Sequence, residues 1–179
     1  PVAGKVISER KIAEIGTTEF KLSNGVKVIL KPTDFKNDEI SFYGFSPGGT
    51  SLYSDADFQS ATNAAAIVSR SGVGEFNSIQ LPKYLNGKRV FVNPMITERS
   101  EGISASTTPK DLETALQLTY LYFTAPRKDP EIFKGIISQQ KGNLANRDSD
   151  PNSVFSDTVS AVIGNYNVRR TGPSVEKLN

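Results

Sequence analysis

The chain of 179 residues contains no histidine and no cysteine. Histidine is the commonest metal ligand and the usual general base near neutral pH. Cysteine is the other main zinc ligand and a leading nucleophile. Their absence excludes a typical zinc site within these residues, and it excludes Ser-His-Asp and Cys-His catalytic arrangements. The carboxylates, lysines, serines and tyrosines that remain do not by themselves indicate one chemistry, and nothing favours a serine–lysine dyad.

The chain also lacks a strong charge bias and long apolar runs. Lysine and arginine number 21 against 19 aspartates and glutamates, a net charge of +2, and the basic residues form only short clusters. We therefore expect no nucleic-acid partner, and no apolar run is long enough to span a membrane. A chain of this length can bury well over half of its unfolded surface, so it needs no disulfide or metal to fold. The absence of cysteine leaves the compartment open.

The first part of the chain carries strand signals. Residues 1–18 are weakly patterned, and we expect a lead-in or linker segment there, followed by a single domain over residues 19–179. Phe20 and Leu22 alternate with polar neighbours, and alternation resumes after Asn24-Gly25. Apolar alternation around this dipeptide predicts a hairpin with a type I′ turn, in which both central residues have positive φ.

Further strands precede a series of helices. Residues 39–47 are apolar on both faces, which predicts a central strand, and two more strands are predicted over residues 88–95 and 102–106. Helical spacing of apolar residues predicts helices over residues 57–69 and 78–85. Three helix starts combine a capping side chain with proline, whose missing N–H needs no partner there: Thr108-Pro109, Asp129-Pro130 and Asp150-Pro151. This order predicts an α+β fold, a mostly antiparallel sheet with helices packed on one face.

Two kinds of local motif fail as ligand sites. The Asp148-x-Asp150-x-Asn152 cluster begins like a calcium loop, but Ser153 and Val159 stand where that loop needs glycine and glutamate. A capping role explains Asp150 better. The glycines of the segments PGGT (47–50) and GVG (72–74) complete neither a phosphate loop nor a dinucleotide turn, so we expect them in turns and helix ends.

Six segments follow one another along the chain: EFKLSNGVKVILKP (19–32), SPGGTSLYSDADF (46–58), SGVGEF (71–76), LPKYLNGKRVFV (81–92), DLETALQLTYLYFTAPRKDPEIF (111–133) and NRDSDPNSVF (146–155). Taken in this order, they resemble the M16 zinc metallopeptidase family, the pitrilysin and insulinase group. The resemblance covers residues 19–179 and is most similar to the third domain of bacterial four-domain members, short of that domain's final part. The last residues, TGPSVEKLN (171–179), read as the start of a helix that is cut short, with Ser174 as its cap, so we expect the natural chain to continue.

The resemblance also implies where a catalytic site would lie. Active domains of the family carry an inverted zinc motif, HxxEH, on the helix after the glycine-rich strand end, and a glutamate farther along completes the zinc site. This places the two histidines at Asn63 and Ile67, the general base at Ala66, and the distal glutamate at Gly142 or Asn143. Every catalytic position is replaced, so we expect no catalytic, cofactor-binding or metal residue in this chain.

The family architecture implies two homologous halves that enclose a chamber, one of which bears zinc. We expect this chain to belong to the zinc-free half and to be inactive alone. Its partners would be a zinc-bearing M16 domain, of the same or another chain, and a peptide or unfolded protein substrate. The parent protein would be a zinc metalloendopeptidase, and the bacterial periplasm or envelope is the implied location.

Two alternatives stay open. The chain can be an inactive M16-like scaffold or assembly subunit, or an unrelated α+β module that binds a ligand or uses carboxylates for catalysis. An HxxEH domain in the same or a neighbouring reading frame would favour the protease.

Overall fold

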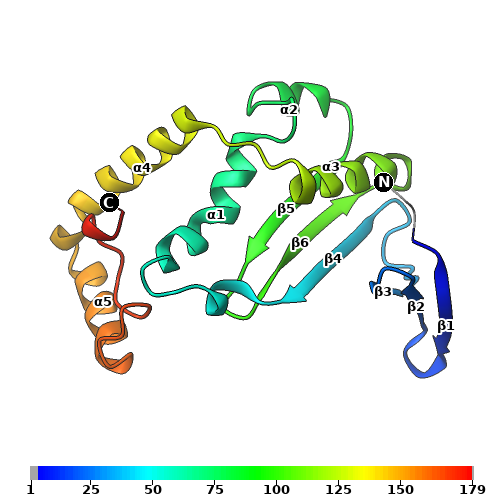
Figure 1. Ribbon diagram of the computed structural model, residues 1–179, viewed down its shortest axis with the longest axis horizontal. Helices are drawn as coiled ribbons and strands as arrows, with labels where there is room; N and C mark the ends of the chain where they lie inside the picture. Colours follow the sequence, from blue (N-terminus) through cyan, green and yellow to red (C-terminus); the bar gives the residue numbers. More distant parts are fainter. Residues whose placement is uncertain (1–3, 179) are drawn as a thin grey trace. The chain divides into compact units, whose positions relative to one another are not determined.

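The computed structural model describes residues 4–178 and divides into two compact units, Pro1–Asp38 and Glu39–Asn179. Each unit contains one three-stranded antiparallel sheet, and the α-helices belong to the second unit (Figure 1). The predicted α+β class is confirmed. No helix in the described part of the chain is both long and apolar enough to cross a membrane.

The first unit is a meander of β1 (Val6–Ile12), β2 (Thr17–Leu22) and β3 (Lys27–Leu30), with β2 in the centre. The structure differs here from the expected lead-in over residues 1–18, because β1 pairs with β2 along its length. Charged residues occupy the middle of this exposed edge strand, which weakens its apolar alternation. The division between units therefore falls after Asp38 and not after residue 18.

The predicted hairpin between β2 and β3 is confirmed, but its turn type is wrong. Leu22 N donates to Val26 O at 2.8 Å, and Gly25 alone in this loop has a positive φ, of 89°. Asn24 instead accepts a hydrogen bond from Val26 N through its side chain, at 3.2 Å. Asparagine often bonds the backbone two residues onward in this way. The result is a longer hairpin loop with glycine at the left-handed position.

The second unit has the strand order β4-β6-β5, from β4 (Ile40–Pro47), β6 (Ser100–Thr107) and β5 (Val90–Ile96). The prediction that β4 is central is wrong, because β6 pairs with both of the other strands. The apolar pattern on both faces of β4 has another cause. Tyr43 and Phe45 are more than half exposed on its outer face, with ring centroids 5.6 Å apart.

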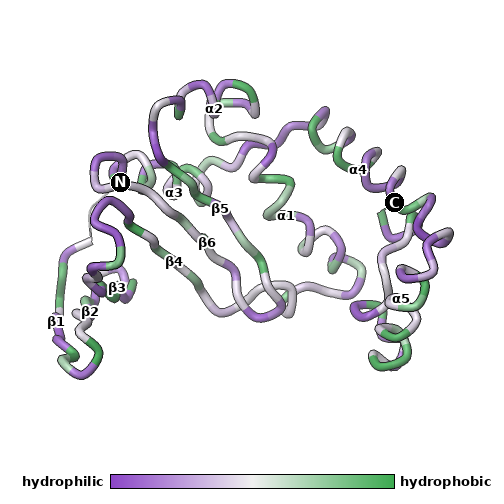
Figure 2. The backbone as a smooth tube through the Cα atoms, turned by 180° about the vertical axis from the view of Figure 1, so that it is seen from behind, coloured by the Kyte–Doolittle hydropathy of each residue, from purple (hydrophilic) through white to green (hydrophobic). Residues whose placement is uncertain are grey.

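The core of the second unit lies between this sheet and α3 (Leu112–Thr124). Stretches of β5 and α3 are hydrophobic in Figure 2. Val92 and Ile103 pack from the sheet against Leu118, and all three side chains are less than 9% exposed. Burial of such side chains stabilises the fold by roughly 1.5–3 kcal/mol each.

The predicted helices form, with small differences at their ends. They are α1 (Phe58–Ser71), α2 (Gln80–Tyr84), α3, α4 (Pro130–Ala145) and α5 (Pro151–Ile163). Asp129 and Asp150 cap α4 and α5 by accepting hydrogen bonds from backbone N–H groups of the first turn. Thr108 also caps as predicted, although a 3-10 turn, Pro109–Asp111, precedes α3. The segment after Ser174 forms a single 3-10 turn, Glu176–Leu178.

Two sets of helix contacts determine where the candidate site lies. In Figure 1, α1 lies between β5 and α4, and it packs against both of them. Helix α5 packs against the 3-10 turn Arg147–Ser149 that precedes it. These packings set the geometry of the candidate site.

Candidate functional site

The glycine pair after β4 is a close-packing turn. Gly49 has a φ of 70°, and a Cβ atom on it would lie 2.3 Å from the carbonyl oxygen of Thr97. Gly49 N donates to Glu101 Oε2 at 2.7 Å, and Thr50 N donates to Thr97 O at 2.9 Å. The glycines let this segment reach the β5–β6 turn, which agrees with the turn role predicted from the sequence.

A polar pair joins α1 to α4. Asn63 Nδ2 donates to Gln59 O at 2.8 Å, which orients its side-chain oxygen away from its own helix. Gln140 Nε2 donates to that oxygen at 3.4 Å. Gln140 Oε1 is buried and has no hydrogen-bond partner in the described structure. The α1–α4 contact therefore contains a neutral amide pair with one unsatisfied acceptor.

The other residues that sequence analysis assigned to this site lie differently. Ile67 is half-buried, one turn beyond Asn63 on α1, whereas Ala66 is exposed. Gly142 and Asn143 on α4 are both exposed. Of the α4 residues, it is Gln140 that bonds Asn63, so the structure does not bring Asn143 to this pair.

Sequence reasoning missed Gln140, although the pattern of α4 contains a signal for it. Ile136, Gln140 and Leu144 are spaced four residues apart, so they share one helix face. Ile136 is buried and the other two are half-buried. A polar residue between two apolar residues on a packed face points to a specific partner across the helix contact.

The chemistry of this arrangement does not fit zinc. Zinc in proteins takes thiolate, imidazole and carboxylate ligands. The polar side chains that meet here are two neutral amides. Among residues 4–178, no group of three or more histidine, cysteine, aspartate or glutamate side chains is placed to hold a metal ion. We therefore derive no metal-dependent step from these residues.

Several ionisable groups have shifted pKa values, and each shift moves the pKa farther from neutral pH. Hydrogen bonds to the carboxylates lower the pKa of four acidic side chains: Asp111, Asp150, Asp157 and Glu176. Burial raises the pKa of Tyr122, and the hydrogen bond to Asp157 raises the pKa of Arg147. A general acid or base works best with a pKa near the working pH. These six groups are therefore poor candidates for proton transfer.

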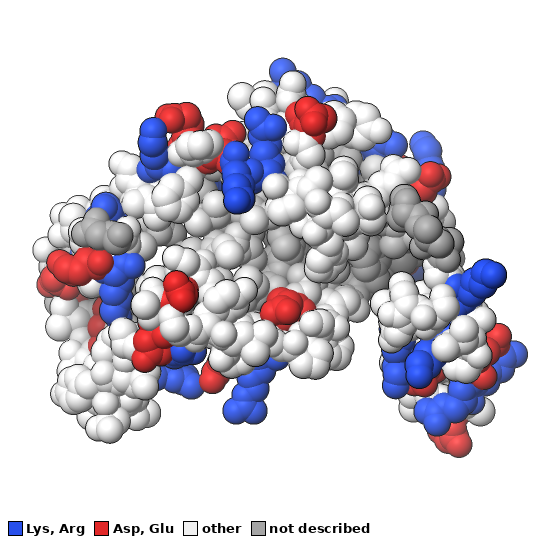
Figure 3. Space-filling view, in the orientation of Figure 1, with Lys and Arg blue, Asp and Glu red and all other residues white. Residues whose placement is uncertain are grey.

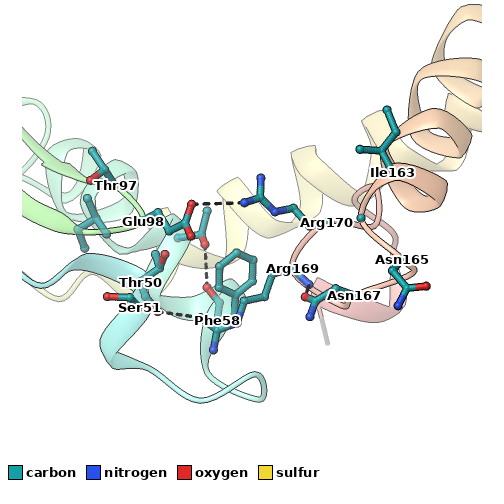
Figure 4. Close-up of a pocket in the computed structure, with 13 residues that line it drawn as sticks. Thr50, Ser51, Phe58, Thr97, Glu98, Ile163, Asn165, Asn167, Arg169 and Arg170 are labelled. Atoms are coloured by element: carbon teal, nitrogen blue, oxygen red, sulfur yellow. Dashed lines mark hydrogen bonds and ion pairs between the residues drawn. The ribbon is translucent and has the colours of Figure 1, made fainter.

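A cleft of about 620 Å³ lies between the start of α1 and the segment after α5 (Figure 4). Two arginines bridge it. Arg169 donates to Asp55 Oδ1 at 2.6 Å, to Tyr53 O at 2.6 Å and to Thr50 O at 3.1 Å. Arg170 forms an ion pair with Glu98 at 3.5 Å. The two arginines tie the segment after α5 to the segment before α1 and to the β5–β6 turn.

Charged side chains are interspersed over the face that Figure 3 presents, with lysine and arginine among aspartate and glutamate. The expectation of no nucleic-acid partner stays a prediction.

No protein-family model matches the chain. A zinc protease PQQL-like protein of Arabidopsis thaliana is 31% identical over 160 residues, which are 89% of this chain and 14% of that protein. The crystal structure of the periplasmic protease PqqL from Escherichia coli superposes with a TM-score of 0.81 at 21% identity, over 99% of this chain and 19% of that one. The ferredoxin protease FusC, solved with Arabidopsis ferredoxin, gives a TM-score of 0.83 at 17% identity, over 99% of this chain and 20% of its own.

The chain is related to the M16 zinc proteases. It spans about a seventh of the Arabidopsis relative and about a fifth of the E. coli protease. Sequence analysis placed the HxxEH positions at Asn63, Ala66 and Ile67, and these residues lie on α1, which Gln140 faces from α4. That correspondence stays a prediction.

Proposed function

We propose that the chain is a zinc-free domain of an M16 protease, which helps to enclose a substrate and does not cut it. The observation that carries the proposal is the hydrogen bond between Asn63 and Gln140. It joins the two helices that would supply zinc ligands in an active M16 domain, and it contains only neutral amides. An amide pair can hold two helices together, but it neither binds zinc tightly nor activates water.

The proposed partner is a zinc-bearing M16 domain of the same or another chain, and the proposed substrate is a peptide or an unfolded protein segment. Two comparisons support this. The chain matches only a small part of much longer zinc proteases. FusC, which has the same fold over the matched part, was solved in complex with a protein, ferredoxin. Zinc would be supplied by the partner domain.

The proposed location is the bacterial periplasm or envelope. Its support is the similarity to PqqL, which is a periplasmic protease in E. coli. Fractionation of cells that express the natural gene would test it, and recovery of the protein in the cytoplasmic fraction would contradict it.

Reconstitution tests the function. The chain is mixed with a separately purified HxxEH-bearing M16 domain, sought in the same or a neighbouring reading frame, and cleavage of a fluorogenic peptide is measured before and after gel filtration. We expect no cleavage by the chain alone, a stable complex, and cleavage by the mixture that chelators abolish. The matched control is the same mixture with the motif glutamate of the partner changed to glutamine.

Other outcomes would overturn the proposal. Chelator-sensitive cleavage by the chain alone would show that it is catalytic. A stable complex that cleaves nothing would favour the inactive scaffold, and the absence of any complex would remove the proposed partner.

A further inference from the structure

The chain contains two Asn-Gly pairs, Asn24-Gly25 and Asn86-Gly87. Asparagine is one of the thermolabile residues of proteins, and a glycine after it leaves the path from the glycine nitrogen to the asparagine Cγ open, because glycine has no side chain. All four residues are exposed. The two glycines have similar φ values of 89° and 78°, and a Cβ atom on either would have no described atom within 4 Å. The two pairs therefore differ mainly in the hydrogen bonds that hold their reacting groups.

Hydrogen bonds hold both reacting groups of the first pair. Asn24 Oδ1 accepts a bond from Val26 N at 3.2 Å, and Gly25 N donates to Leu22 O at 2.9 Å. The Gly25 nitrogen can lose its proton and attack only after it leaves Leu22 O, and the Asn24 amide must turn its face toward that nitrogen, which breaks the bond to Val26 N. Each bond that must break slows the reaction by about two- to tenfold.

The second pair lies in the turn between α2 and β5, where its reacting groups are open to solvent. In the described part of the chain, the Asn86 side chain and Gly87 N have no hydrogen-bond partner. The turn is held by two other backbone bonds, from Asn86 N to Lys83 O at 3.3 Å and from Lys88 N to Leu85 O at 3.0 Å. Because neither bond involves a reacting group, the Asn86 side chain and the Gly87 nitrogen can approach each other while the turn stays folded.

We propose that Asn86 is a site of spontaneous deamidation, and that in the folded chain it reacts faster than Asn24. Hydroxide takes the proton of Gly87 N, and this nitrogen attacks Cγ of Asn86. The N–Cγ bond forms and the bond from Cγ to Nδ2 breaks, so that ammonia leaves with a proton from water and a cyclic imide remains. Water then opens the imide at either of its carbonyls and gives aspartate or isoaspartate. The reaction consumes a water and releases an ammonia, and it is independent of the proposed function.

Deamidation at this site would alter the connection into β5. Arg89 N donates to Oδ2 of the buried Asp111 at 2.9 Å, which ties the start of β5 to the residue that precedes α3. Isoaspartate adds a carbon atom to the main chain shortly before Arg89 and would displace this donor from Asp111. We therefore expect aged chains to unfold at a lower urea concentration than fresh ones.

The test is to incubate the whole folded chain in mildly alkaline buffer and to follow both sites by peptide mapping with mass spectrometry. Deamidation is measured as the mass gained when an amide NH2 becomes OH, and chromatography separates aspartate from isoaspartate. We expect Asn86 to react faster than Asn24 by about four- to hundredfold, the combined effect of two bonds of about two- to tenfold each. Both products should appear at position 86.

The same chain unfolded in urea is the control for structure, because unfolding removes the bonds of the first pair. The two sites should then react at similar rates. Asn86→Gln is the control for the site, since glutamine would have to form a larger ring and reacts more slowly. This variant should show no conversion at position 86 and no fall in its urea midpoint during incubation. Asn24→Gln is the matched variant of the first pair and should age like the natural chain.

Three outcomes would overturn the proposal: no conversion at Asn86 while the chain stays folded, conversion of Asn24 at an equal or higher rate, or the same ratio of the two rates in the folded and the unfolded chain. Aspartate as the sole product would contradict the imide route. A urea midpoint that falls equally in the natural chain and in Asn86→Gln, or in neither, would contradict the effect on β5.

Discussion

Replacing Gly49 with alanine tests whether the glycine pair after β4 is needed for close packing. At a φ of 70°, an L-residue costs roughly 1–2 kcal/mol more than glycine. The added methyl group would also lie 2.3 Å from Thr97 O and 2.7 Å from Ser100 N, so one of the two segments must move. That movement would break the bonds from Gly49 N to Glu101 and from Thr50 N to Thr97 O, each contributing about 0.5–1.5 kcal/mol. We expect a total destabilisation of roughly 2–5 kcal/mol.

Gly87→Ala is the matched control. Gly87 has nearly the same φ, 78°, but a Cβ atom there would have no neighbour within 4 Å. This variant should therefore be destabilised only by the cost of placing an L-residue in the left-handed backbone conformation, roughly 1–2 kcal/mol. Urea unfolding of both variants, followed by circular dichroism, measures the difference. Equal destabilisation of the two would refute the argument that close approach to the β5–β6 turn requires glycine at position 49.

Two further predictions concern the second unit. Leu118→Ala should destabilise the protein by about 2–5 kcal/mol, because Leu118 is only 6% exposed in the core. Leu116→Ala, at a 52% exposed position of the same helix, should change stability by less than about 0.5 kcal/mol. Similar urea midpoints of the two variants would contradict the assigned core. Asp157 accepts two hydrogen bonds of 2.8 Å from Arg147, and these bonds lower its pKa in the folded protein. The carboxylate therefore adds to the stability of the fold above its unfolded pKa of about 3.9, and this added stability is lost as the pH falls through the folded pKa. Asp157→Asn should therefore be less stable than the natural chain at neutral pH and lose less stability on acidification, and parallel pH profiles of the urea midpoint would refute this.

Helix starts were predictable from the sequence because their cause is local. Asp129 and Asp150 each precede proline, and their side chains bond the first free N–H groups of the helix. These interactions span two or three residues, so the sequence pattern contains both partners. The hairpin at Asn24-Gly25 was predictable for the same reason. Its turn type was not, because the Asn24 side chain has two alternative roles that a dipeptide pattern does not distinguish.

Strand order and side-chain pairing across helices depend on distant parts of the chain. The apolar pattern of β4 is compatible with a central strand and with an edge strand whose aromatic rings pack on each other. The charged residues of β1 weaken its apolar alternation, so the sequence did not indicate this strand, which is stabilised by its pairing with β2. The family resemblance placed the candidate site on α1 and α4, which stays a prediction. The residue that faces Asn63 is Gln140, and this depends on how α4 is rotated against α1. The expectation that the natural chain continues beyond residue 179 stays a prediction.

The central claim is that the contact between α1 and α4 has lost the ability to hold zinc. Its most direct test is the zinc content of the purified chain after incubation with equimolar zinc and gel filtration, measured by mass spectrometry. The account predicts far less than one zinc per chain and no change in zinc content on Asn63→Ala, because neutral amides compete poorly with water for zinc. One zinc retained per chain and lost on Asn63→Ala or Gln140→Ala would contradict it.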